Sequence, residues 1–301
     1  MAWKGLHLSR PAHLGMERGS LVIDFRDDGE PKSFRVPVED LGWIIADTPR
    51  ITFSSSLLSR CSAEGVLILG VDDSHLPSWA SLPWTKFHRH GEVLRLQLDA
   101  NLPLYKRLWQ EIVRRKITAQ AKCLSLLGRT KAVHLAAMAG SVKSGDADNI
   151  EARAAQLYFK HLFPRRYFTR HADDFPNHLL NYGYAVLRAV IARNLCAMGF
   201  MPQIGIHHRS LANAYNLADD LIEPFRPLVD RLAVTLSSDR EKEEVLDLAD
   251  RRSLAALLEC EVATSIGSTT LFHAVELTVE SLKSALRDQD VSRLQFPEPR
   301  S

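Results

Sequence analysis

The hydrophobic period of the chain changes near residue 100, and this change constrains the fold more than any other feature. Before it, short runs rich in β-branched and aromatic residues are separated by turn residues, which is the pattern of β-strands. After it, apolar residues such as Leu108, Ile112 and Ile117 recur at helical spacings. The sequence therefore predicts an α+β chain, with a small N-terminal β-rich, sandwich-like domain followed by a larger all-α domain.

The same change of period divides the chain into segments. Residues 1–98 are expected to form the β-rich domain, residues 99–105 a linker, and residues 106–301 the helical domain. A chain of 301 residues is long enough for two domains that each bury a core. Its 46% hydrophobic and 25% charged residues are typical of globular proteins, which excludes disorder as the main state.

Local patterns in the sequence predict individual helices and strands. One short helix is expected near residues 55–63. Residues 93–98 are expected to form a strand, because apolar and polar residues alternate there. Between residues 104 and 290 we expect seven to nine helices.

The sequence also bears on location. No apolar run approaches the roughly 18 residues that span a bilayer. Residues 1–7 lack the apolar core of a signal peptide. We therefore expect a cytoplasmic protein with no membrane partner.

The charge of the chain is unevenly distributed. The formal net charge is only +2, but residues 101–170 contain 14 Lys and Arg against 4 Asp and Glu. Residues 1–100 and 171–301 are both net acidic. A basic stretch of this kind is often a set of solvated helix faces, but it also suits a partner rich in phosphates.

Two clusters of polar residues suit a metal ion. His207 and His208 are adjacent, so at most one of them faces a given site on a regular element. Asp220 and Glu223 are three residues apart and share a helix face, while Asp219 and Glu223, four apart, are the alternative pair. Like charges this close repel unless a cation lies between them. This pattern indicates a metal.

A third cluster surrounds Glu151, which lies in the first turn of a predicted helix with Asp148 or Asn149 as its cap. Each cluster taken singly is usually ordinary surface. Two carboxylates and a histidine together suit Mn²⁺ or, less exclusively, Mg²⁺. Beside a basic stretch, such a site indicates phosphodiester chemistry. A DNA-binding scaffold without chemistry and a hydrolase of small phosphate esters remain open, whereas nucleotide-binding glycine motifs are absent from the sequence.

Three sequence blocks resemble one known family. Residues 180–188, 205–208 and 217–227 together strongly resemble the CRISPR-associated spacer-acquisition integrase, a metal-dependent DNA endonuclease. The form His-His with Leu-Ala-Asp-Asp-Leu-Ile-Glu-Pro-Phe-Arg-Pro resembles the branch that accompanies the single large RNA-guided nuclease (type II). The resemblance extends to residues 3–23 and 103–121, and so covers almost the whole chain.

The resemblance implies a catalytic site. Carried over by position, the catalytic metal ligands are Glu151, His208 and Glu223, with Asp220 assisting as a ligand or through water. His207 and Asp219 remain alternatives to His208 and Asp220. The implied cofactor is Mg²⁺ or Mn²⁺.

The resemblance also implies a reaction and partners. The 3′-hydroxyl of a captured DNA fragment would attack the repeat of a CRISPR array by transesterification. The implied assembly is a homodimer formed through the N-terminal domain, with a small second CRISPR-associated adaptation protein bridging two dimers and the RNA-guided nuclease as a further candidate. Basic side chains would contact the DNA phosphates. The candidates are Arg114, Arg115, Lys116, Arg153, Arg165, Arg166, Arg170 and Arg209.

Overall fold

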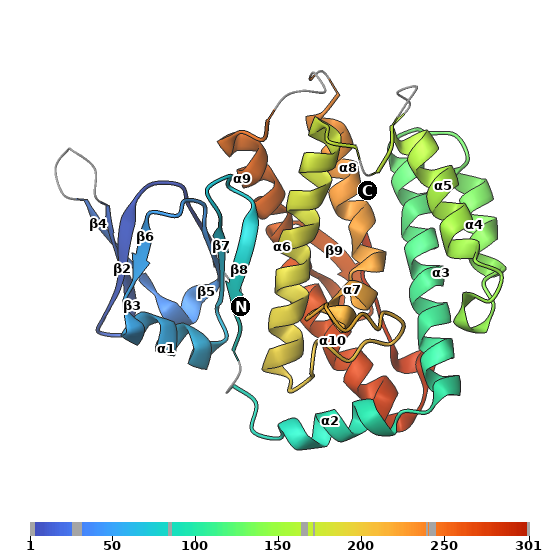
Figure 1. Cartoon of the computed structure of the whole chain (residues 1–301), viewed down its shortest axis with the longest axis horizontal. Helices are drawn as coiled ribbons and strands as arrows, with labels where there is room; N and C mark the ends of the chain where they lie inside the picture. The colour runs from blue at the N-terminus through green and yellow to red at the C-terminus, as the bar shows by residue number, and fades with distance from the viewer. Residues whose placement is uncertain are drawn as a thin grey trace.

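The computed structural model describes residues 4–25, 32–83, 86–163, 168–170, 172–238, 240 and 245–299. The N-terminal strands gather at one end of the molecule and long helices form most of the other (Figure 1). The predicted class, a β-rich N-terminal part followed by a helical part, is confirmed.

The N-terminal strands form two four-stranded sheets, ordered β1-β5-β7-β8 and β4-β3-β2-β6. The strands are β1 (Lys4–Leu8), β2 (Ala12–Glu17), β3 (Ser20–Phe25), β4 (Ser33–Pro37), β5 (Leu41–Ala46), β6 (Ile51–Phe53), β7 (Leu67–Val71) and β8 (Pro77–Ser81). A 3₁₀ turn, η1 (Val38–Asp40), leads into β5. The predicted short helix is α1 (Ser55–Glu64). Ser54 caps its first turn, and Gly65 ends it with a φ of 76°.

Strand β5 joins the two parts of the molecule because its residues alternate between two cores. Ile44 and Ala46 pack in the core of the sandwich, whereas Trp43 and Ile45 belong to the core of the helical part. Successive side chains of a strand point to opposite faces, so one strand serves both cores. Strands β5 and β7, at the centre of this sheet, are therefore buried on both faces.

The strand predicted over residues 93–98 is wrong. This segment belongs to a helix, α2 (His90–Asp99), whose buried residues Val93 and Gln97 are one turn apart. The Gln97 side chain donates to the carbonyls of Met201 and Ile204 and accepts from the amide of Met201. One of the two buried residues of this helix is therefore polar. The alternation of leucines with polar residues predicts a strand and gives no sign that Gln97 is buried. The next helix begins at Leu102, inside the predicted linker.

The helical part is built around one buried helix, α6, which lies between the sandwich and the group formed by α3, α4 and α5 (Figure 1). Eight α-helices lie between residues 102 and 290 in the described chain, within the predicted number. They are α3 (Leu102–Leu126), α4 (Ala132–Gly140), α5 (Ile150–Leu162), α6 (Phe175–Ala197), α7 (Asn216–Leu221), α8 (Arg226–Leu236), α9 (Leu248–Ala256) and α10 (Leu271–Asp288).

Short elements connect these helices. The 3₁₀ turns are η2 (Ser144–Asp146), η3 (Glu223–Phe225), η4 (Leu257–Glu259) and η5 (Val291–Arg293). A small sheet of order β10-β9-β11, made by Gly267–Thr270, Glu261–Thr264 and Glu298–Pro299, was not predicted. Within the described chain, no helix is both long and apolar enough to cross a bilayer.

Candidate functional site

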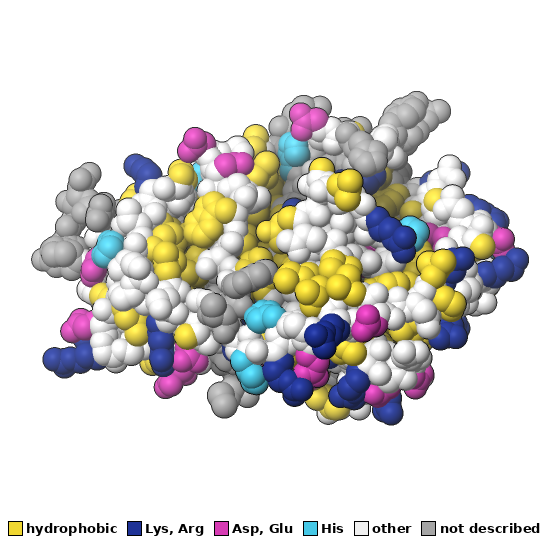
Figure 2. Space-filling view, turned by 60° about the horizontal axis from the view of Figure 1, so that its bottom comes forward, with side chains coloured by type: hydrophobic (Ala, Val, Ile, Leu, Met, Phe, Trp, Pro, Cys, Tyr) yellow, Lys and Arg dark blue, Asp and Glu magenta, His cyan; other side chains and the backbone are white. Residues whose placement is uncertain are grey.

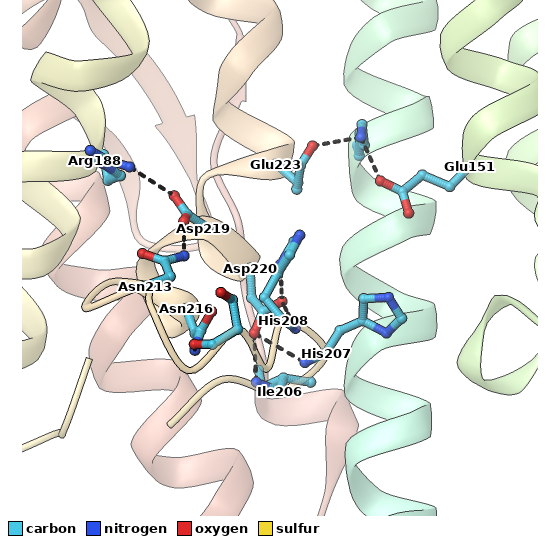
Figure 3. Close-up of polar contacts among 12 residues, drawn as sticks. Glu151, Arg188, Ile206, His207, His208, Asn213, Asn216, Asp219, Asp220 and Glu223 are labelled. Carbon is cyan, nitrogen blue, oxygen red and sulfur yellow. Dashed lines mark hydrogen bonds and ion pairs between the residues drawn. The ribbon is translucent and has the colours of Figure 1, made fainter. Parts of the chain in front are cut away.

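Two carboxylates from separate elements converge on one lysine. Lys116 lies in the middle of α3, Glu151 in the first turn of α5, and Glu223 at the start of η3 (Figure 3). The Lys116 Nζ is 2.6 Å from Glu151 Oε1 and 2.6 Å from Glu223 Oε2. Glu223 is 6% exposed and Glu151 23%. The structure therefore brings together two of the predicted catalytic residues around a single positive charge.

The position of Glu151 depends on Asp146. The Asp146 carboxylate accepts hydrogen bonds from the amides of Ile150 and Glu151, at 2.9 and 3.0 Å. Neither predicted cap takes this role. Asn149 makes no capping bond, and Asp148 pairs with Lys143 on the surface. Asp146 thus satisfies the free amides at the start of α5 and fixes the turn that carries Glu151.

Glu223 is held as an anion although it is buried. Burial alone would raise the pKa of Glu223, but the positive charges of Lys116 and Arg226 outweigh it and hold the pKa below its usual value. Arg226 Nη2 lies 3.2 Å from Glu223 Oε1. Burial alone would lower the pKa of Lys116, but the negative charges of Glu223 and Glu151 outweigh it and raise that pKa. The site is therefore charged and paired at neutral pH.

Asp220 organises the loop that carries the histidines. This fully buried carboxylate accepts hydrogen bonds from the amides of Ile206, His207 and His208, at 2.5, 3.1 and 3.1 Å. Gly205 lies so close that a Cβ there would be 2.8 Å from Asp220 Oδ2 and 2.3 Å from the His208 carbonyl oxygen. The loop can close around Asp220 only because residue 205 has no side chain.

The ring of His208 is oriented by the same carboxylate. His208 Nδ1 lies 2.7 Å from Asp220 Oδ1. A carboxylate only accepts, so Nδ1 carries the proton, and in the neutral ring Nε2 is left as the free ligand atom. This hydrogen bond is the main reason that the pKa of His208 is raised. Figure 3 shows the ring directed toward Glu223, and the two charges influence each other's pKa.

The two alternative residues point elsewhere. The His207 ring is stacked flat on Trp109, with ring centres 4.1 Å apart and an interplanar angle of 4°. Asp219 accepts a hydrogen bond from Asn213 at 2.7 Å and lies 3.8 Å from Arg188 (Figure 3). The structure thus directs His208 and Asp220 toward the site, and His207 and Asp219 away from it.

The predicted DNA-contacting residues fall into different environments. Arg114, Arg153 and Arg209 are exposed. Arg115 is bonded to Glu111, and the guanidinium of Arg170 donates to Asn177 and Asn181. Arg165 and Arg166 lie outside the described residues.

Lys116 differs from these arginines because its side chain is only 12% exposed and its charge is used inside the site. On the face shown in Figure 2, Lys and Arg side chains are mixed with acidic ones, and hydrophobic side chains gather between them.

A pocket of about 620 Å³ opens beside His208. Its lining includes Gln97, Tyr105, Arg209 and Asn216. Such a volume can hold a nucleotide-sized group next to the histidine.

A buried hydrogen-bonded chain lies behind Glu223. Arg226 packs over the ring of Tyr184, at 4.8 Å from its centre, and the Tyr184 hydroxyl donates to Asp230. Tyr158 donates to the other Asp230 oxygen at 2.8 Å. Burial raises the pKa of Asp230 to about 6, although both hydroxyls lower it.

No group of three or more His, Cys, Asp or Glu side chains in the described chain is close enough to hold a metal ion as it stands. The position between Glu151 and Glu223 is taken by the Lys116 ammonium. Two carboxylates that converge on one cation are nevertheless the donor set that a hard divalent ion prefers.

Lys116, Asp146 and Asp230 have roles in the site that were not predicted from the sequence. Helical spacing was a usable signal for Lys116, since Ile112 and Lys116 are one turn apart on the buried side of α3. The cap at Asp146 lies four residues before the helix, beyond the usual capping position. No local signal distinguished Asp230 from a surface acid.

Comparison with known proteins settles the family. The family model described as CRISPR associated protein Cas1 matches residues 6–247. The CRISPR-associated endonuclease Cas1 of Neisseria meningitidis serogroup C (strain 8013) is 36% identical over 299 residues, which cover 99% of this chain and 97% of that protein. This chain belongs to the CRISPR-associated Cas1 family. The predicted family and enzyme class, a CRISPR-associated endonuclease, are confirmed.

Solved structures share the fold. A casposase bound to integration product superposes with a TM-score of 0.77 at 18% identity, covering 100% of this chain and 96% of that one. A Cas6-RT-Cas1–Cas2 complex contains a chain that superposes with a TM-score of 0.74 at 20% identity, covering 100% of this chain and 36% of that one. These Cas1-like structures therefore include one with an integration product and one with Cas2.

Proposed function

We propose that this Cas1-family chain is the metal-dependent nuclease and integrase of CRISPR adaptation, which joins the 3′-hydroxyl ends of captured DNA fragments to the repeat of a CRISPR array. The observation that carries the proposal is the convergence of Glu151 and Glu223 on one cationic position, with His208 directed toward Glu223. Transesterification of a phosphodiester needs positive charge and positioning more than covalent chemistry.

The donor set fits a hard divalent ion, Mn²⁺ or Mg²⁺. Glu151 and Glu223 supply carboxylate oxygens, and His208 supplies Nε2 because its Nδ1 is bonded to Asp220. Such an ion, when bound, neutralises charge on the phosphate and makes the attacking hydroxyl more acidic. In this proposal Asp220 positions His208 rather than binding the ion, since its oxygens already accept four hydrogen bonds.

Residues around the metal ligands would bind the DNA. The pocket beside His208 would receive the DNA end, with Arg209 at its edge. Exposed arginines such as Arg114 and Arg153 would hold the phosphates on either side. Binding that relies on such contacts weakens steeply as salt is raised.

We further propose a homodimer formed through residues 1–98, bridged by a small second adaptation protein such as Cas2. Two large hydrophobic side chains of this part, Phe34 and Trp79, are 52% and 44% exposed, which suits an interface. Sedimentation should give twice the 33.8 kDa mass of one chain; a chain that stays monomeric at all concentrations would exclude the dimer.

The test is strand joining of a branched DNA in Mn²⁺. Glu151→Gln, His208→Ala and Glu223→Gln should each lower the rate at least about 100-fold. Binding of the same DNA, measured by fluorescence anisotropy, should be retained, because the exposed arginines are unchanged.

The neighbouring residues give matched controls. His207→Ala and Asp219→Asn change the adjacent residues, which point away from the site, and should have much smaller effects. If all three site variants still joined strands, the site would be wrong. If the unchanged chain bound DNA but neither nicked nor joined it in any divalent metal, it would be a DNA-binding scaffold instead.

A further inference from the structure

Lys116 occupies the place between the two acidic side chains that the proposed function gives to a metal ion. Its Nζ contacts one oxygen of each carboxylate, at 2.6 Å in both cases. An ion bound by Glu151 and Glu223 would lie within about 2.1 Å of those oxygens. The ammonium and a divalent cation cannot both occupy this position, because they overlap in space and repel each other.

The lysine also explains why the acids stay close together in the absence of metal. Glu223 is almost fully buried, and a second carboxylate beside it would be repelled without a positive charge between them. Of the two carboxylates, Arg226 pairs with Glu223, through Oε1, which is the oxygen that Lys116 does not contact. Among the cations of the described chain, Lys116 is the one that contacts both carboxylates.

A lysine can leave such a position more easily than an arginine. Its ammonium is a point charge on a flexible four-carbon stem, and it has no planar fork to match the carboxylates. The side chain is partly open to solvent, with 12% of its surface exposed. A flexible, partly exposed side chain of this kind can withdraw Nζ by a change of rotamer.

From this geometry we infer that Lys116 is an internal cation that holds Glu151 and Glu223 in place while the site is free of metal, and that a divalent ion must displace it in order to bind. Lys116 is thus a positioning residue that competes with the metal. It sets the concentration of metal at which the site fills. This inference rests on the proposed function, because it assumes that the two carboxylates bind the ion.

The test measures Mn²⁺ affinity by isothermal titration calorimetry, without DNA and without any assay of activity. Lys116→Met removes the competing charge and should bind Mn²⁺ about tenfold more tightly than the unchanged chain, if the lysine fills the position nine-tenths of the time. The same variant should be less stable without metal and gain more stability from Mn²⁺.

Lys122→Met is the matched control. It makes the same substitution in the same helix, at a lysine that is 38% exposed and 3.8 Å from Glu298. Its Mn²⁺ affinity should equal that of the unchanged chain. Lys116→Gln, which keeps a polar side chain but not the charge, replaces Lys116→Met if the methionine variant does not fold.

Equal or weaker Mn²⁺ binding by the Lys116 variants would overturn the inference, because competition requires a gain. Glu223→Gln separates this failure from failure of the proposed function. If Glu223→Gln abolishes Mn²⁺ binding while the Lys116 variants show no gain, only the inference is wrong. If Glu223→Gln leaves Mn²⁺ binding unchanged, the ion binds elsewhere and both are wrong.

Discussion

Three consecutive basic residues, Arg114, Arg115 and Lys116, have different environments because a helix rotates by about 100° per residue. The first two lie outward and share Glu111. Lys116 lies one turn after Ile112 and points inward to the acids. The total charge of the segment could be read from the sequence. Which of these charges lies on the surface and which lies in the site depends on the direction that each residue faces on the helix.

The choice between neighbouring residues of one type could not be made from the sequence. His207 and His208 differ only in which partner is near, and that partner is Trp109 for one and Asp220 for the other. Trp109 is far from His207 in the sequence, and Asp220 lies on a separate element from His208. Residue type and spacing therefore predicted pairs of neighbouring candidates for the site. The packing of each side chain then shows which member of a pair is directed toward it.

Asp230 provides a prediction of pH dependence. Its pKa is raised to about 6 in the folded chain, whereas an unfolded aspartate keeps its ordinary value near 4. Between these values the folded state binds more protons, so this group's contribution to stability falls as pH rises. The change amounts to about 3 kcal/mol.

Asp230→Asn should remove this contribution. Urea unfolding of both chains from pH 4 to pH 7 should show the stability of the unchanged chain falling relative to the variant by up to about 3 kcal/mol. One of the two tyrosine hydroxyls that donate to Asp230 can still donate to the amide oxygen of asparagine, and the other can accept from its amide nitrogen. A difference between the two chains that does not vary with pH would contradict the account.

At the scale of single elements, the first turn of α5 connects stability to the site. Asp146→Ala removes the acceptor for the amides of Ile150 and Glu151 and should cost about 1 kcal/mol. Because the same turn carries Glu151, strand joining should fall more than the loss of stability explains.

Asp148→Ala is the control for that change. It lies two residues away and loses only a surface ion pair with Lys143, worth between about 0 and 1 kcal/mol. Chemical unfolding and the joining rate together check both variants. If Asp148→Ala lowered the joining rate as much as Asp146→Ala, the cap would not be what positions Glu151.

Elements with strong local signals could be predicted, and those fixed by distant contacts could not. Helix α1 has a serine cap and a terminal glycine, and both can be read from the sequence. The alternation over residues 93–98 predicts a strand where helix α2 forms, because the contacts that bury its polar residue Gln97 come from residues more than 100 positions away. The short strands β9, β10 and β11 have two to four residues each, which is too short for a clear period.

For the whole molecule, the sequence predicted two parts but not how they join. Asp47, fully buried after β5, forms two 2.9 Å contacts with Arg251 of α9. Arg193 of α6 donates to the carbonyl of Gly65 at the end of α1. These pairs are more than 100 residues apart in the chain. Charged residues are rarely buried, so no local pattern indicated that they would meet across the interface.

The proposed function requires Glu151, His208 and Glu223 to bind the metal ion of a phosphodiester-transfer site. Anomalous diffraction from crystals grown with Mn²⁺ locates that ion. We expect a manganese peak with oxygens of both glutamates and His208 Nε2 as ligands, the oxygens at about 2.1 Å. Lys116 Nζ should have left its present position. A manganese peak that lies away from these three side chains, or density that keeps the ammonium between the two glutamates at saturating Mn²⁺, would contradict the account.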